Sequence, residues 1–451
     1  MGTLGGFPSS PAMVRGRQSQ PTPHATIALE AVMSEVRRGY KQTEVGVIPE
    51  AWKIVSTSQV CDMIVDCKNR TPPIFETGDY AVVRTPNVRS GKFVREDLFF
   101  TDEKSFKEWT ARAVPQPGDV LITREAPLGE VCLVPGDLHV CLGQRMMLYR
   151  PNAAAVDGRF LLFALMSTGV QACLLKKIGG STVGHAKVDD IRNLQIPFPP
   201  NRIEQEAIAE ALSDADALIE SLEQLLTKKR QIKQGAMQEL LTGKKRLAGF
   251  KDVWGTRTLE QISAFITKGS TPTTYGFGWT DSGVMFLRSE CVSERGLDLG
   301  ESMFISSGAH TLLRRSEVRA GDILMTITGN VGRVIMLGPE FPEANINQHI
   351  ARIRISARDV DPWFVFHMLT PPSVRNRYNS ITTGQAYPQI SLAQVRSTEI
   401  SVPSLSEQTA IAAVLTDMDA AIATAETKLI KARQLKQGMM QELLTGRTRL
   451  V

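Results

Sequence analysis

The chain has 451 residues, of which 42% are hydrophobic and 22% charged, values typical of a globular protein with more than one domain. Its net charge is +5, because 52 basic residues nearly balance 47 acidic ones, so a nucleic-acid partner is permitted but not required. The six cysteines lack metal-ligand spacing, and no apolar run approaches the roughly 18 residues that cross a bilayer. Composition therefore argues against a zinc knuckle and a membrane span, and favours a cytoplasmic protein with reduced thiols.

Residues 1–37 are rich in glycine, proline, serine and glutamine, and they offer little that a core would bury. We expect a disordered tail there. The alternative is a mis-assigned start, with the natural chain beginning at Met33, because organised sequence begins close behind that residue. The sequence leaves both explanations open.

Residues 38–203 are expected to form a first globular domain of mixed helices and strands. Apolar runs predict strands at 80–88, 119–125 and 145–151, and a longer apolar stretch predicts a buried helix at 159–178. Residues 248–406 follow the same order, with strands expected at 284–292, 322–328 and 349–355 and a helix at 361–369.

The segments 204–247 and 407–451 are each predicted to form one long helix. Apolar residues recur at alternating spacings of four and three, which is the seam of a coiled coil. The seam consists of Ile208, Leu212, Ala215, Ile219, Leu222 and Leu226 in the first segment, and of Ile411, Leu415, Met418, Ile422, Ala425 and Leu429 in the second. Acidic first turns and basic later turns suit the helix dipole, and Gly243 and Gly446 are typical helix stops.

The two long-helix segments are copies of each other. Residues 204–247 and 407–450 agree at about 27 of 44 positions without a gap, which indicates a duplication. The duplication continues upstream more weakly, for example in Gly118-Asp119-Val120-Leu121 and Gly321-Asp322-Ile323-Leu324. We infer that the preserved parts share one task, whereas the divergent parts perform different ones; neutral drift of loosely constrained surface is the alternative.

A long helix with a single apolar seam needs a partner. The other copy in the same chain is the obvious one, and pairing of two similar units predicts an antiparallel two-helix coiled coil. The alternative is that each helix packs only on its own domain.

The order of these motifs resembles the specificity subunits of type I restriction–modification systems. The resemblance covers about residues 38–451 and is carried by the opening KQTEVGVIPEAWKI, the paired GDxL motifs, IPFPP, EQxxI and the long helices that end in LLTG. It implies a mixed α/β (α+β) fold class, with two target recognition domains in a pseudo-twofold arrangement, separated by a pair of long antiparallel coiled-coil helices.

The resemblance further implies a non-catalytic subunit that reads a bipartite, asymmetric sequence in double-stranded DNA. The paired helices set the spacing between half-sites and dock two methyltransferase (modification) subunits, and restriction (motor–nuclease) subunits join for cleavage. The chain itself then needs no cofactor, because S-adenosylmethionine, ATP and Mg are expected on the partner subunits.

Candidate DNA contacts are polar side chains at strand ends and in loops, where two-pronged contacts to bases or charge contacts to phosphates are possible. In the first domain they are Lys68, Asn69, Arg70, Arg84, Asn87, Arg89, Arg124 and Arg145; in the second they are Lys268, Thr271, Thr273, Arg288, Asn330, Arg333, Asn347 and Gln348. Matching loops at 180–182 and 383–385 are further candidates. For each residue the alternative is a solvated side chain or a structural hydrogen bond.

Catalytic motifs of a DNA methyltransferase are missing from the sequence. There is no glycine-rich donor pocket, and the string nearest to a base-holding loop, Asp361-Pro362-Trp363-Phe364, lacks the second proline and is expected to begin a helix. No phosphate-binding loop occurs, and the histidines are too isolated to suggest a metal site. Competing hypotheses are a free-standing methyltransferase or nuclease with unrecognised motifs, and a coiled-coil scaffold that only assembles proteins.

Overall fold

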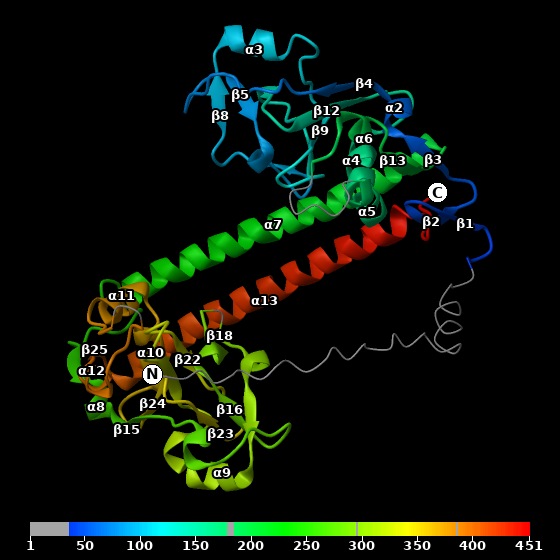
Figure 1. Ribbon diagram of the computed structural model, residues 1–451. Helices are drawn as coiled ribbons and strands as arrows, with labels where there is room; N and C mark the ends of the chain where they lie inside the picture. The colour runs from blue at the N-terminus through cyan, green and yellow to red at the C-terminus, as the bar shows by residue number, and fades with distance from the viewer. Residues whose placement is uncertain (1–35, 178–184, 295, 385–386) are drawn as a thin grey trace, which may run out of the picture. The chain divides into compact units, whose positions relative to one another are not determined.

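A computed structural model describes residues 36–177, 185–294, 296–384 and 387–451 (Figure 1). The expected N-terminal tail therefore lies almost entirely outside the described residues. Contacts within the chain define two compact units. The first runs to Ala217 and includes Arg433–Val451, and the second is Leu218–Ala432. Each unit thus contains one divergent domain and parts of both long helices.

A four-stranded antiparallel sheet forms the centre of the first unit. Its order is β10 (Val131–Leu133), β9 (Val120–Thr123), β12 (Met146–Pro151) and β4 (Cys61–Asp66). Both faces are covered, because successive residues of β9 belong to different cores. Val120 and Ile122 pack with the apolar residues of α4 (Gly158–Met166), and Leu121 packs with β5 (Tyr80–Val83). Alternate side chains of a strand point to opposite faces, so a sheet buried on both sides is apolar throughout.

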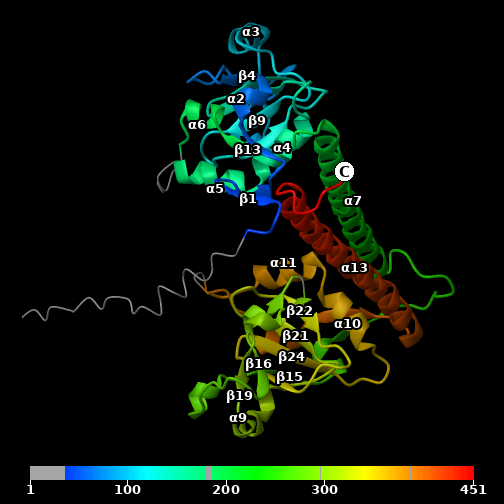
Figure 2. The same ribbon diagram turned by 90° about the vertical axis from the view of Figure 1, so that its right-hand side faces the viewer.

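The other elements of the first unit surround this sheet. A second sheet has the order β11 (His139–Leu142), β5 and β8 (Phe99–Thr101), with β5 and β11 parallel. Two-stranded sheets pair β1 (Tyr40–Thr43) with β2 (Gly46–Pro49), β3 (Lys53–Ser56) with β13 (Gln195–Phe198), and β6 (Val88–Arg89) with β7 (Lys92–Phe93). The short helices are α2 (Thr57–Val60), η1 (Thr85–Asn87), α3 (Glu103–Trp109), α5 (Thr168–Lys177) and α6 (Val188–Arg192). Of these, α3 lies at the end of the domain farthest from the long helix (Figures 1 and 2).

The second unit repeats this plan. Its central sheet has the order β15 (Ser263–Lys268), β24 (Ile350–Ile355), β21 (Ile323–Thr326) and β22 (Val334–Met336). A second sheet contains β19 (Met303–Ile305), β16 (Val284–Leu287), β23 (Ala344–Ile346) and β20 (Glu317–Val318), and again has a parallel pair, β16 with β23. The small sheets are β14 (Gly255–Thr258) with β25 (Glu399–Val402), and β17 (Val292–Ser293) with β18 (Gly296–Leu297).

Short helices complete the second unit. They are α8 (Leu259–Ile262), η2 (Pro272–Tyr275), η3 (Ser289–Cys291), η4 (Leu299–Glu301), α9 (Ser307–Leu312), η5 (Arg314–Ser316), α10 (Pro362–Leu369), α11 (Pro372–Ser380) and α12 (Leu392–Arg396). Pro362 begins α10 behind the capping carboxylate of Asp361, as expected for a helix start rather than a base-holding loop.

Several predicted elements are shorter than the apolar runs suggested. The predicted strand 80–88 ends at Val83, because Pro86 lies within a 3₁₀ turn, and the predicted strand 284–292 ends at Leu287 before a similar turn. The single helix predicted at 159–178 was wrong. Ser167 has extended backbone angles and separates α4 from α5, which are bent by 63°.

The two long helices are α7 (Arg202–Leu240) and α13 (Leu405–Leu443), each of 39 residues. In the second unit Ile219 and Leu226 of α7 pack with Ala425 and Leu429 of α13. In the first unit Ile208 and Leu212 share a core with Leu443 and Leu444. The start of α7 thus meets the end of α13 in the first unit, and in the second unit Met237 and Leu240, near the end of α7, pack with Ile411 and Leu415, near the start of α13. The predicted antiparallel pairing is confirmed. All the seam residues are buried or partly buried.

Candidate nucleic-acid interface

The loop after β4 gathers positive charge around one indole ring. The Lys68 ammonium lies 4.8 Å and the Arg70 guanidinium 5.0 Å from the centre of the Trp109 ring. Both cations also contact the Glu108 carboxylate, at 2.8 and 2.5 Å. Trp109 Nε1 in turn donates to the Arg70 carbonyl at 3.0 Å. The loop is therefore held in place with one net positive charge at its surface.

In both units a glutamine joins this loop to the turn before a central strand, which is β12 in the first unit and β24 in the second. Gln144 donates to the Asn69 carbonyl at 2.8 Å. Gln348, at the equivalent position, accepts a hydrogen bond from the Thr271 hydroxyl. The two glutamines thus have the same place and opposite hydrogen-bonding roles. We conclude that they position the turn, which is the structural role that the sequence left open for Gln348.

Four polar side chains form a connected network beside this turn in the first unit. Glu125 contacts Arg145 at 2.5 Å and lies 3.0 Å from Nδ1 of His185. Nε2 of His185 lies 3.1 Å from the Arg124 guanidinium, which also donates to the Ala186 carbonyl at 3.2 Å. Arg124 is buried, whereas about half of the Arg145 side chain is exposed. Glu125 and His185 were not among the sequence candidates. They are 60 positions apart, so no local pattern in the sequence relates them.

The same backbone framework carries different side chains in the second unit. The amide of Arg124 donates to the Arg145 carbonyl at 2.7 Å, and the amide of Ile327 donates to the His349 carbonyl at 2.9 Å. Likewise, the Arg124 carbonyl accepts a hydrogen bond from the Ala186 amide, and the Ile327 carbonyl accepts one from the Ile390 amide. These matching bonds place Thr328, His349 and Gln389 where the first unit has Glu125, Arg145 and His185.

Three sequence candidates are occupied by structural bonds. Arg84 donates to the Asp97 carbonyl at 2.9 Å, and Arg288 donates to the Glu301 carbonyl at 3.1 Å, thirteen residues onward in each case. Asn87 is fully buried and holds the carbonyls of Val94 and Glu96. The structural alternative accounts for these three side chains without DNA.

The other candidates differ in exposure. Exposed side chains are those of Arg89, Lys268, Thr273 and Asn330, and partly buried ones are those of Thr271 and Arg333. Asn347 is buried and accepts a hydrogen bond from the His349 amide at 3.1 Å. Residues 180–182 and 385 of the two candidate loops lie outside the described residues.

Metal ligands and reactive thiols are two chemical features of catalytic sites. In the part of the chain that the structure describes, no group of three or more His, Cys, Asp or Glu side chains is arranged to hold a metal ion. Burial raises the pKa of the Cys132 and Cys141 thiols to about 12, so both remain protonated and unreactive near neutral pH.

Each unit contains an ion pair between a buried carboxylate at a helix start and an arginine in the tail that follows the other long helix. Glu204 at the start of α7 is fully buried and pairs through both oxygens with Arg449, beyond α13. Glu407 at the start of α13 is also fully buried and pairs in the same way with Arg246, beyond α7, at 2.5 and 2.6 Å. A tryptophan lies under each arginine, Trp52 at 5.9 Å and Trp254 at 5.5 Å.

An exposed face of each long helix is also identical in the two copies. We call it the glutamine face: Gln231, Gln234, Gly235 and Gln238 on α7, and Gln434, Gln437, Gly438 and Gln441 on α13. The glutamines are exposed, and a Cβ atom at either glycine would meet nothing within 4 Å. Because glycine in a helix costs about 1 kcal/mol relative to alanine, packing within the chain does not explain these glycines.

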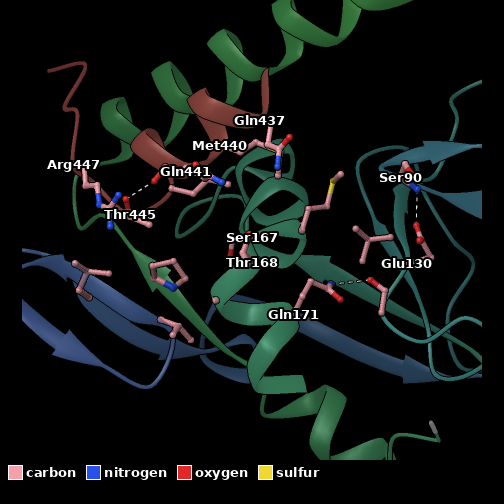
Figure 3. Close-up of a pocket in the computed structure, with 18 of the residues that line it drawn as sticks. Ser90, Glu130, Ser167, Thr168, Gln171, Gln437, Met440, Gln441, Thr445 and Arg447 are labelled. Carbon is pink, nitrogen blue, oxygen red and sulfur yellow. Dashed lines mark hydrogen bonds between the residues drawn. The ribbon is translucent and has the colours of Figure 1, made fainter. Parts of the chain in front are cut away.

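A cavity of about 570 Å³ in the first unit adjoins this face (Figure 3). Gln437 and Gln441 line it from α13, together with Met166 and Gln171 from the region of α4 and α5. Its described lining includes none of the candidate DNA contacts. The cavity therefore lies between the end of α13 and the first domain, away from the candidate DNA contacts.

Comparison with known proteins assigns the family. Residues 49–234 and 254–434 each match the type I restriction modification DNA specificity domain. The chain belongs to this family. Each match covers one copy of the duplicated unit, so both copies have the family pattern.

Related proteins span nearly the whole chain. A putative type I restriction enzyme MjaX specificity subunit of Methanocaldococcus jannaschii is 26% identical, over 91% of this chain and 97% of its own length. The type I restriction enzyme EcoKI specificity subunit of Escherichia coli K12 is 25% identical, over 88% and 89%. The crystal structure of the type I S subunit from M. genitalium has a TM-score of 0.59, with 16% identity, over 87% of this chain and 96% of that one. That structure supports the fold alone.

The helices of the described residues differ from membrane-spanning helices in length or in apolarity. No single one is long and apolar enough to cross a bilayer. Helices α4 and α5 reach the length and apolarity of a span only when they are taken together across their 63° bend. Their apolar residues lie in the core of the first unit.

Proposed function

We propose that the chain is the DNA-recognition subunit of a type I restriction–modification complex and has no catalytic centre of its own. Domains 38–203 and 248–406 each read one half of a bipartite, asymmetric target in double-stranded DNA. The segments 204–247 and 407–451 are spacers between them. The observation that carries this proposal is the matching backbone of the two units, which holds different polar side chains at the same strand ends. Such an arrangement suits two readers of different sequence.

Two copies of a methyltransferase subunit are the partners that the preserved helices fit best. The glutamine face recurs on α7 and α13 with identical residues, although exposed positions drift freely unless something binds them. Its glycines allow a partner to approach the helix backbone closely. The same surface in each unit supports the same partner on each.

The chemistry of the complex then belongs to the partners. The methyltransferase subunits bind S-adenosylmethionine, and the restriction (motor–nuclease) subunits bind ATP and Mg. This division is consistent with the protonated thiols of this chain and with the missing methyltransferase motifs. A complex that acts on chromosomal DNA is expected in the cytoplasm.

Co-expression with the methyltransferase subunit, followed by genome-wide mapping of methylated adenines, tests the proposal. We expect a split motif with a fixed gap. Exchange of residues 50–200 for the equivalent region of a relative should change one half of the motif and leave the other half and the gap intact. If both halves changed together, the two domains would not be independent readers.

Two further assays separate the competing functions. Tight stoichiometric binding of labelled S-adenosylmethionine by the isolated chain would favour a free-standing methyltransferase. Absence of DNA binding by the assembled complex would favour a scaffold. We expect neither result.

A further inference from the structure

The two polar clusters near the turn before β12 differ in how their cations are paired with carboxylates. Lys68 and Arg70 share one carboxylate, that of Glu108, so this cluster keeps a positive charge suited to a phosphate group. In the other cluster the Arg124 guanidinium is buried beside His185, and the exposed Arg145 guanidinium pairs one to one with Glu125. A carboxylate beside the guanidinium repels a phosphate, so the Arg145–Glu125 pair is better matched to the edge of a base.

The pair also contributes little to the stability of the fold. About half of the Arg145 side chain is exposed, and ion pairs at such positions add little. Arg145 has a φ of +71°, in the left-handed region that a non-glycine residue rarely adopts. The turn is nevertheless held there by the bond from the Arg124 amide to the Arg145 carbonyl at 2.7 Å. An unfavourable conformation that the surroundings enforce points to function.

The hydrogen-bonding groups of the pair complement one particular base pair. An arginine fork donates to O6 and N7 of guanine, and a carboxylate accepts from the N4 amino group of cytosine. Glu125 is held from two sides, by Arg145 and by His185, which fixes its acceptor oxygens beside the donors of Arg145. Donors and acceptors therefore lie next to each other, as the two edges of a guanine–cytosine pair require.

We propose that Arg145 and Glu125 read one guanine–cytosine base pair in the half-site of the first unit. Arg145 donates to guanine and Glu125 accepts from cytosine; Gln144 and His185 are positioning residues. The inference rests on the proposed function, since it assumes that this domain reads DNA. The second unit has His349 and Thr328 at the equivalent positions, without an arginine–carboxylate pair, so its half-site need not have guanine–cytosine there.

The test uses the assembled methyltransferase complex and its map of methylated adenines. With Arg145→Ala we expect one guanine–cytosine position in one half of the motif to become degenerate. In binding to synthetic duplexes, preference for that pair over the other base pairs should fall about ten-fold to a hundred-fold. Glu125→Gln should relax the same position. Arg145→Lys, which keeps the charge but not the fork, should recover binding strength more than base preference.

Arg70→Ala is the matched control, because we assign Arg70 to phosphate contact. It should weaken binding to all duplexes alike and reduce the salt dependence, with the motif unchanged. Melting temperatures of the variants report whether each one folds, and Arg145→His, which has the residue of the second unit, provides another substitution.

The inference is overturned if Arg145→Ala leaves the motif sharp, if it weakens all sequences alike, or if the first unit's half-site contains no guanine–cytosine pair. A wild-type complex that gives no split motif would instead overturn the proposed function.

Discussion

Glu407, fully buried at the start of α13, binds the guanidinium of Arg246 through both of its carboxylate oxygens. The tail that follows α7 is thereby fixed to the first turn of the other long helix. Trp254 joins the pair, because its indole nitrogen donates to Glu407 at 3.3 Å. The duplicated contact between Glu204 and Arg449 has the same form in the first unit.

Replacement of Glu407 by glutamine should lower the melting temperature of the chain, because it removes the charge of a fully buried carboxylate that binds the partly buried Arg246 through both oxygens. Thermal unfolding followed by circular dichroism measures the change. Glu206→Thr is the control, since Glu206 is exposed and the equivalent residue of the second copy is Thr409. Equal effects of the two substitutions would show that the buried pair has no special role.

The aspartate of each GDxL motif should be essential to its sheet. Asp322 is buried and binds Arg354 of β24 through both oxygens at 2.6 Å, as Asp119 binds Arg150 of β12. Asp322→Asn should destabilise the second unit by about 3 kcal/mol, because the arginine loses a buried partner. Urea unfolding tests this. Asp359→Asn, at an exposed carboxylate paired with Arg257, should change little, and a similar loss there would count against the prediction.

Burial of His367 should make the second unit sensitive to acid. The ring is fully buried in α10, with Nε2 3.0 Å from the Thr416 hydroxyl. Burial, with a contribution from Lys233, lowers the pKa of His367 to about 4, while Asp361 opposes the shift. Since the pKa of an unfolded histidine is about 6.5, stability is retained above pH 6.5 and is lost as pH falls from 6.5 through 4, by up to about 3 kcal/mol.

His367→Phe should remove this acid-dependent loss, and the first unit already has Phe163 at the equivalent position. Unfolding in urea at pH 7.5 and at pH 5 provides the comparison. His139→Gln, at an exposed histidine, should leave the pH dependence unchanged. An unchanged loss of stability in His367→Phe would assign the acid sensitivity to other groups.

Gly235 on the glutamine face should separate stability from assembly. Gly235→Ala should stabilise the chain by about 0.5–1 kcal/mol, because the helix gains alanine and a Cβ atom meets open space. The same methyl group should weaken binding of the methyltransferase subunit. Calorimetric titration measures the second effect, and Ala217→Gly, at an exposed helix position, controls for helix stability alone. Undiminished assembly would remove this face from the partner surface.

The spacer should be testable by length. Insertion of a few residues into 204–240 should change the gap between half-sites, or abolish binding, without changing the bases that are read. Methylation mapping of the complex shows both properties at once. A changed base identity at an unchanged gap would contradict the assigned role of these helices.

The sequence by itself determined the duplication and the two long helices. The spacing of residues such as Ile208 and Leu212 fixes one apolar side of a helix, because that periodicity depends only on neighbours along the chain. The stops at Gly243 and Gly446 were also predictable, and both have the left-handed backbone that glycine favours. The family pattern followed from the order of these local motifs.

Only the tertiary structure decided which distant residues meet. Glu204 and Arg449 are 245 positions apart, and no local pattern relates them. Beyond the break at Ser167, α5 lies against the turn between β1 and β2, where a Cβ atom on Gly169 would lie 1.9 Å from the Val45 carbonyl oxygen. Arg84 and Asn87 were candidate DNA contacts in the sequence, and the structure shows that each donates to a backbone carbonyl group. Such occupancy is set by long-range packing, which the sequence does not display.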